Sequence, residues 1–76
     1  MAIDKPSGKL LKKLGLRLRG IRESKGWTLE YAEERGVKNW QHLQQIESGK
    51  KNINFTTLIR LCKVYRISPS ELLKEF

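Results

Sequence analysis

The chain has 76 residues and a formal net charge of +8, from sixteen Lys and Arg against eight Asp and Glu. This length provides one small hydrophobic core and excludes a second, and the lone cysteine, Cys62, excludes an intramolecular disulfide and a cysteine-rich zinc site. No apolar run approaches the ~20 residues of a membrane span, and the start MAIDKPSGK lacks the pattern of a secretory signal, so we expect a cytoplasmic protein.

The positive charge is unevenly distributed along the chain. Residues 1–25 contain eight bases and two acids (+6), residues 26–49 two bases and four acids (−2), and residues 50–76 six bases and two acids (+4). A basic balance attracts polyanions, and composition alone leaves open whether these are nucleic acids or anionic membranes. We expect a flexible arm over residues 1–7 and one folded domain over residues 8–76.

Helical periodicity runs through the chain, and neither sustained period-2 alternation nor a hairpin dipeptide indicates a strand. The first predicted helix covers residues 9–24 and ends before Gly26. Arg22 follows Leu18 by four residues, so it lies at the edge of the apolar stripe, where a cation needs a partner. The stripe has spacings of three, four and three residues: Leu11, Leu14, Leu18 and Ile21.

Two short helices follow, each with a capping residue before it and a glycine after it. Thr28 can cap a helix over residues 29–35, and Asn39 can cap one over residues 40–48. Only the sequence GVK and the cap separate them. This connection is short enough to set the two helices at the steep angle of a helix-turn-helix.

Two more helices complete the predicted fold. Asn54 can cap the first of them, and the sequence SPSE from Ser68 to Glu71 combines a capping box with proline at the first helical position of the second. The sequence therefore predicts a compact all-α domain of five helices. The apolar faces of the last two helices consist of Phe55, Leu58, Leu61, Cys62 and Tyr65, and of Leu72, Leu73 and Phe76.

The third predicted helix carries neutral amides on its outer face. At 100° per residue, Leu43 and Ile46 define its buried side and leave Gln41, Gln44 and Gln45 opposite. An amide can pair bidentately with adenine in the major groove, a contact worth ~1–3 kcal/mol of discrimination between bases. Glutamine is also a good helix former, so the composition of this helix alone is compatible with a merely solvated face.

The residues after this helix favour a role in DNA binding. Lys50, Lys51 and Asn52 follow it directly, where they could hold the flanking DNA backbone. Phosphate contacts position a protein on the duplex, and base contacts specify the sequence.

Two stretches, LGLRLRGIRESKGWTLE and IESGKKNINFTTLIRLCKVYRISPSELL, resemble the helix-turn-helix family of phage lambda-type repressors and Cro, also called the XRE family. The resemblance covers roughly Leu14 to Leu73. Its most telling pieces are the leucine-glycine-x-arginine start, the sequence KGWT before the second helix, and IESGKKN at the end of the third. It implies a lambda repressor-like DNA-binding fold with a helix-turn-helix.

The resemblance also implies roles for individual residues, with helix 39–48 in the major groove. The implied structural ion pair joins Arg22 to Glu47, which helical spacing independently puts at the edges of buried faces. The implied phosphate contacts are Thr28, Lys50, Lys51 and Asn52. The implied base contacts are Asn39, Trp40, Gln41, Gln44 and Gln45.

Three positions depart from the family pattern. Leu29 stands where the second helix usually begins with glutamine, so one polar DNA contact is missing. The small residue of that helix aligns with Glu33 without gaps, or with Ala32 if the turn is one residue longer, which leaves the tilt of the third helix open. Arg66 stands where a glycine is expected, so it must adopt a left-handed conformation or shift the helix cap.

We predict no catalytic site, metal site or cofactor, and hence no enzyme. His42 has neither a second histidine nor paired cysteines to complete a metal site, and Cys62 lies on an apolar helix face, where a buried structural thiol is ordinary. Acidic residues near a helix start are ordinary partners of the helix dipole, and nothing complements them for catalysis. These acids are Glu30, Glu33 and Glu34.

The leading hypothesis is a sequence-specific transcriptional regulator, most simply a repressor, that binds double-stranded DNA without a membrane partner. A homodimer joined through the C-terminal helix would bind an inverted-repeat operator with half-sites ~34 Å apart. One alternative keeps the fold and is an antitoxin or a restriction-modification controller. The other is a membrane-surface or partner-binding module based on the basic amphipathic stretch GKLLKKLGLRLRGIR.

Overall fold

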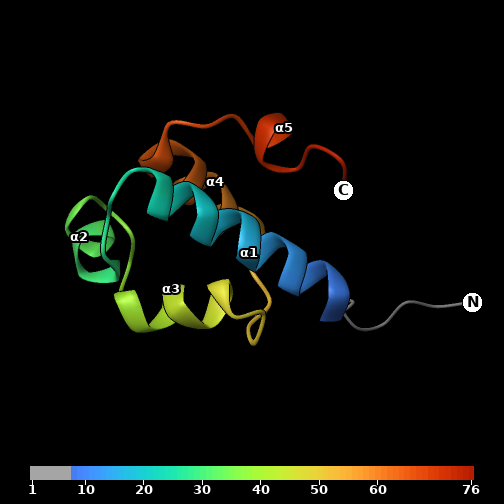
Figure 1. The fold of residues 1–76 in the computed structure, drawn as a ribbon, viewed down its shortest axis with the longest axis horizontal. Helices are drawn as coiled ribbons and strands as arrows, with labels where there is room; N and C mark the ends of the chain where they lie inside the picture. Colours follow the sequence, from blue (N-terminus) through green and yellow to red (C-terminus); the bar gives the residue numbers. More distant parts are fainter. Residues whose placement is uncertain (1–7) are drawn as a thin grey trace, which may run out of the picture.

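The computed structural model describes residues 8–76, and this part of the chain contains five α-helices joined by short connections (Figure 1). The all-α prediction is confirmed, and none of these helices is long and apolar enough to cross a bilayer. The predicted arm over residues 1–7 lies outside the described residues. The helices are α1 (Gly8–Ser24), α2 (Leu29–Glu34), α3 (Trp40–Glu47), α4 (Phe55–Tyr65) and α5 (Pro69–Leu72).

The long helix α1 crosses the middle of the molecule (Figure 1). Helix α3 runs back along one side of α1 with α2 packed at its start, and α5 lies on the other side of α1. This arrangement leaves one long face of α3 turned away from the rest of the domain.

Each helix from α2 to α5 begins at a side-chain cap. In every case the side-chain oxygen accepts a hydrogen bond from the backbone N–H three residues later, at 2.6–3.0 Å. Such a cap satisfies a donor that the first helical turn leaves without a backbone partner. The four caps, all predicted, are Thr28, Asn39, Asn54 and Ser68.

Helix α4 ends at an arginine in a left-handed conformation. Arg66 has φ 58° and ψ 47°, and the N–H of Ile67 donates to the carbonyl of Cys62 at 3.0 Å. The first three helices use a glycine with positive φ for the same purpose. Of the two outcomes considered for Arg66, the protein therefore adopts the strained one.

Every helix contributes at least one side chain to a common core. Tyr65 is one of its buried residues, and the centroid of its ring lies 5.7 Å from that of the Trp27 ring. Burial, reinforced by the charge of Glu47, raises the pKa of Tyr65 to about 12, and burial also raises the pKa of the Cys62 thiol. The buried apolar residues are Leu14, Leu18, Ala32, Val37, Leu43, Ile46, Leu61, Cys62, Tyr65 and Leu72.

Burial decides whether Ala32 or Glu33 corresponds to the small residue that the family pattern has in its second helix. Ala32 is fully buried and Val37, in the turn after α2, is also in the core, whereas Glu33 is only partly buried. The N–H of Val37 donates to the carbonyl of Ala32 at 3.2 Å and closes the turn. The small core residue is therefore Ala32, and the turn is the longer of the two forms considered.

The predicted apolar face of α4 is wrong at its first residue. Phe55 is 73% exposed, although Leu61 and Tyr65 on the same face are buried. Helical spacing gives the direction in which a side chain points, but it does not say whether another element covers it. Phe55 is thus an exposed aromatic side chain at the start of α4.

Two cations of α1 hold the segment that follows α5. Arg17 Nη1 donates to the carbonyls of Leu72 at 3.0 Å and Lys74 at 2.7 Å. Arg17 and Lys13 both lie over the ring of Phe76, at 5.1 and 4.7 Å from its centroid. Phe76 therefore packs against α1 while 42% of its surface stays exposed.

Candidate nucleic-acid interface

Helix α3 is fixed against α1 at two glycines. Gly15 is buried, and a Cβ atom there would lie 2.5 Å from the backbone oxygen of Ile46 and closer still to that of Glu47. A Cβ on Gly49, just after α3, would lie 2.8 Å from the Lys12 side chain. Because neither glycine has a side chain, the two helices can approach to backbone contact.

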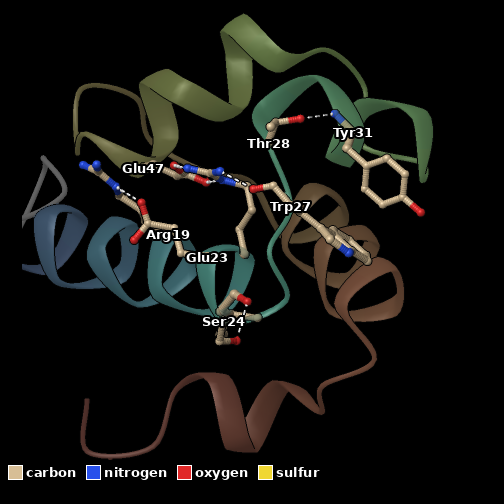
Figure 2. A network of polar contacts seen from close by, with 9 residues as sticks. Arg19, Glu23, Ser24, Trp27, Thr28, Tyr31 and Glu47 are labelled. Atoms are coloured by element: carbon tan, nitrogen blue, oxygen red, sulfur yellow. Dashed lines mark hydrogen bonds and ion pairs between the residues drawn. The ribbon is translucent and has the colours of Figure 1, made fainter.

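A buried ion pair joins the same two helices (Figure 2). Arg22 Nε donates to one carboxylate oxygen of Glu47 at 2.7 Å, and Nη2 donates to the other at 3.0 Å. Arg22 Nη1 also donates to the carbonyl of Trp27 at 2.7 Å, which ties down the segment before α2. The hydrogen bond to Glu47 holds the pKa of Arg22 above its usual value, although burial opposes this shift. A two-point pair of this kind restrains the rotation of α3 about its own axis.

The outer face of α3 carries the three glutamines. Gln41, Gln44 and Gln45 are exposed, and Leu43 and Ile46 on the opposite side are buried. Each glutamine side chain offers one acceptor oxygen and two N–H donors to whatever this face meets. The arrangement provides neutral groups that both donate and accept hydrogen bonds, on a helix whose position is fixed by its packing against α1.

The other predicted DNA contacts differ in how exposed they are and in whether they already make hydrogen bonds within the protein. Thr28 Oγ1 and Asn39 Oδ1 both accept capping hydrogen bonds, from Tyr31 N at 3.0 Å and His42 N at 2.6 Å. The hydroxyl of Thr28 and the amide N–H groups of Asn39 are their remaining donors. Trp40 is half-buried, like Asn39, so the start of α3 is less accessible than the glutamines.

The loop after α3 is basic and exposed. Lys50, Lys51 and Asn52 are all exposed, and Asn52 Oδ1 accepts a hydrogen bond from the N–H of Ile53 at 2.9 Å. The N–H of Lys50 donates to the carbonyl of Gln45 at 2.9 Å, so the loop starts from a closed helix end. Two exposed lysines therefore follow closely, along the chain, the helix that carries the glutamines.

The main apolar stripe of the basic helix α1 packs into the domain core. Leu14 and Leu18 of its predicted stripe are buried in the core. Leu16, on another side of the helix, is 65% exposed. Because the apolar stripe already covers the domain core, the interpretation of this stretch as a lipid-binding module is not favoured.

Two features of this surface were missed in the sequence. Gly15 lies within the leucine-glycine-x-arginine motif, but its backbone contact with α3 was not predicted. Lys12, Gly15, Arg19 and Arg22 follow one another at spacings of three, four and three, the spacing of one helix face. That spacing was the available signal that all four residues face α3.

Comparison with known proteins agrees with this geometry. The model of the helix-turn-helix family HTH_3 matches residues 18–72, most of the chain, including all of α2 and α3. Searches of curated proteins and of solved structures returned no match. The short connection between α2 and α3, the exposed glutamines and this match lead to one conclusion: the chain belongs to the XRE-type helix-turn-helix family of DNA-binding regulators.

Proposed function

We propose that this protein is a sequence-specific transcriptional regulator, and more narrowly a repressor, that inserts α3 into the major groove of double-stranded DNA. The observation that carries the proposal is the exposure of Gln41, Gln44 and Gln45 on one face of α3. Base edges in the major groove present patterns of donors and acceptors that amides can match. Asn39 and Trp40 complete the proposed set of base contacts.

The rigidity of α3 supports this proposal. Reading a base requires hydrogen-bonding groups held in place to a fraction of an ångström, which depends on the residues behind them. The contact of Gly15 with the α3 backbone and the ion pair between Arg22 and Glu47 provide that support. We therefore assign this pair a structural role rather than a DNA contact.

Backbone contacts are proposed for the groups that flank the glutamines. Exposed lysine ammonium groups attract phosphates without regard to sequence, and each phosphate neutralised makes binding more sensitive to salt. The proposed phosphate contacts are Thr28, Lys50, Lys51 and Asn52.

We also propose that the protein binds an inverted-repeat operator as a homodimer. Two exposed apolar side chains just after α5, Leu73 and Phe76, support this because they are 38% and 42% accessible. Leu72, also expected on this surface, is instead fully buried in the domain core. A two-fold axis would place the half-sites ~34 Å apart, one turn of the duplex. Occupancy of such a site is sufficient to block transcription from an overlapping promoter.

Selection of bound sites from random duplex DNA tests the proposed function, because it reports sequence preference, half-site spacing and symmetry together. Gln45→Ala should lose ~1–3 kcal/mol of binding free energy on the selected site and little on random DNA. Lys51→Ala should weaken both alike and reduce the salt slope by ~0.9. Failure to enrich any sequence, or equal losses by both variants on both DNAs, would contradict the proposed division of roles.

A further inference from the structure

A shallow depression lies between α1, the start of α2 and the outer side of α3. Its volume is about 220 Å³, and it lies open beside the exposed face of α3. The residues that line it are Arg19, Arg22, Leu29, Gln44, Glu47 and Ser48.

The charges in this depression are arranged in two layers. At its base, Arg22 and Glu47 neutralise each other in the buried ion pair. At its rim stands the exposed side chain of Arg19, and the opposite rim is formed by Gln44 and Ser48 of α3. The accessible charge of the depression is therefore the Arg19 cation, placed beside a glutamine of the proposed base-reading face.

The residue that α2 contributes to this depression, Leu29, is nonpolar, and this makes the nearby Arg19 cation important. Leu29 is the first residue of α2 and lines the same depression, but its hydrocarbon side chain offers no hydrogen-bond donor to a phosphate. Arg19 projects from α1 on the side that faces α3 (Figure 2), with a planar guanidinium suited to two-point phosphate binding.

We propose that Arg19 binds a backbone phosphate of the DNA, supplying from α1 the contact that Leu29 cannot make at the start of α2. This inference rests on the proposed function and adds a third element, α1, to the interface. The phosphate lies over the depression, so that Arg19 and the ammonium groups after α3 hold the DNA backbone on either side of the glutamines.

Glu23 affects how strongly Arg19 can bind the phosphate. Its carboxylate accepts a hydrogen bond from Arg19 Nε at 3.0 Å, one helical turn along α1, and the Arg19 and Glu23 side chains are 57% and 54% exposed. An exposed pair of this kind is weak, and the terminal nitrogens of the guanidinium extend beyond it. Glu23 therefore orients Arg19 in the free protein and places a negative charge close to the incoming phosphate.

The test measures duplex binding by fluorescence anisotropy as a function of salt, for the full chain, four single variants and one double variant. Arg19→Gln should reduce the slope of log K against log salt by ~0.9, so that its deficit relative to the wild type changes about 3.5-fold between about 50 and 200 mM salt. The loss should be equal on the selected site and on random duplex. Arg19→Lys keeps the charge and should retain the wild-type slope.

Two further single variants and one double variant complete the experiment. Glu23→Gln should tighten binding to every duplex, and this gain should be smaller when it is combined with Arg19→Gln, because the part that comes from releasing Arg19 is then absent. Lys63→Gln removes one positive charge from the exposed side of α4, in a depression lined by Ile59 and Arg66, and is the matched control. Circular dichroism verifies that each variant is folded.

The outcomes separate this inference from the proposed function. Wild-type binding to a selected site, with Arg19→Gln no different from Lys63→Gln in slope or affinity, overturns the role of Arg19 alone. Absence of duplex binding by the wild-type protein at low salt overturns both. A slope loss specific to Arg19→Gln, with the loss shared by random and selected DNA, establishes the contact.

Discussion

Replacement of Arg22 by alanine tests whether the ion pair beneath α3 stabilises the fold as a buried pair should. The change removes the hydrogen bonds of 2.7 and 3.0 Å to Glu47 and leaves that carboxylate in a site where the residue is only 7% exposed. It also removes the 2.7 Å hydrogen bond to the carbonyl of Trp27. Loss of one partner from a buried pair costs about 3–5 kcal/mol, because the other charge is stranded.

This cost is large against the stability available to the domain. At about 0.05–0.15 kcal/mol per residue, a chain of this length unfolds with a free energy of about 4–11 kcal/mol. Arg22→Ala should therefore remove about a quarter or more of the total free energy of unfolding. Arg22→Met combined with Glu47→Leu removes both charges, and the double variant should be more stable than either single variant.

Urea unfolding followed by far-UV circular dichroism measures these differences for the wild type, for Arg22→Ala, for the single variants Arg22→Met and Glu47→Leu, and for their double variant. The coupling free energy from the cycle should be about 1–3 kcal/mol. A loss below about 1 kcal/mol for Arg22→Ala, as for an exposed ion pair, would refute the reasoning. So would strict additivity in the double variant.

Three further predictions concern backbone and core positions. Gly15→Ala should lower the free energy of unfolding by about 1–3 kcal/mol because its Cβ would meet the α3 backbone. The control Gly20→Ala has open space at its Cβ position and should raise the free energy of unfolding by up to about 1 kcal/mol. Thermal unfolding distinguishes the two variants, and equal effects would contradict the contact of Gly15 with α3. Arg66→Gly should relieve the left-handed strain and raise the melting temperature by about 4–8 °C for about 1 kcal/mol, and an unchanged or lower value would argue against strain.

Tyr65→Phe should be neutral or raise stability by about 1 kcal/mol, because the buried hydroxyl has no hydrogen-bond partner among residues 8–76. In the wild type the raised pKa of Tyr65, about 12, makes a contribution to the free energy of unfolding that is fully present below pH 10. This contribution is lost as the pH rises toward 12, at about 1.4 kcal/mol per pH unit. Tyr65→Phe should abolish this part of the loss of stability at alkaline pH, as measured by unfolding at a series of pH values.

Features that depend on neighbours along the chain could be predicted from the sequence. Caps such as Asn39 and Asn54 act within one helical turn, and a glycine such as Gly49 ends a helix through its own backbone freedom. The approximate helix bounds therefore followed from these caps and glycines, and the outward direction of the glutamines followed from helical spacing. The family was predicted from motifs of the same local kind and was confirmed by the family match.

Other features required the assembled fold, because they are contacts between residues far apart in the chain. Ala32 rather than Glu33 is in the core because of how the longer turn packs α2, and Phe55 is exposed because no other element within residues 8–76 covers it. Helical spacing can show that Gly15 and Arg19 share a face, but only the packing of α1 on α3 brings one to the α3 backbone and the other to the depression beside Gln44. The sequence by itself determined the helices and the side chains each presents, since their hydrogen bonds and periodicity are local. Only the tertiary structure decided which of those side chains meet or stay exposed, since burial depends on contacts across the whole chain.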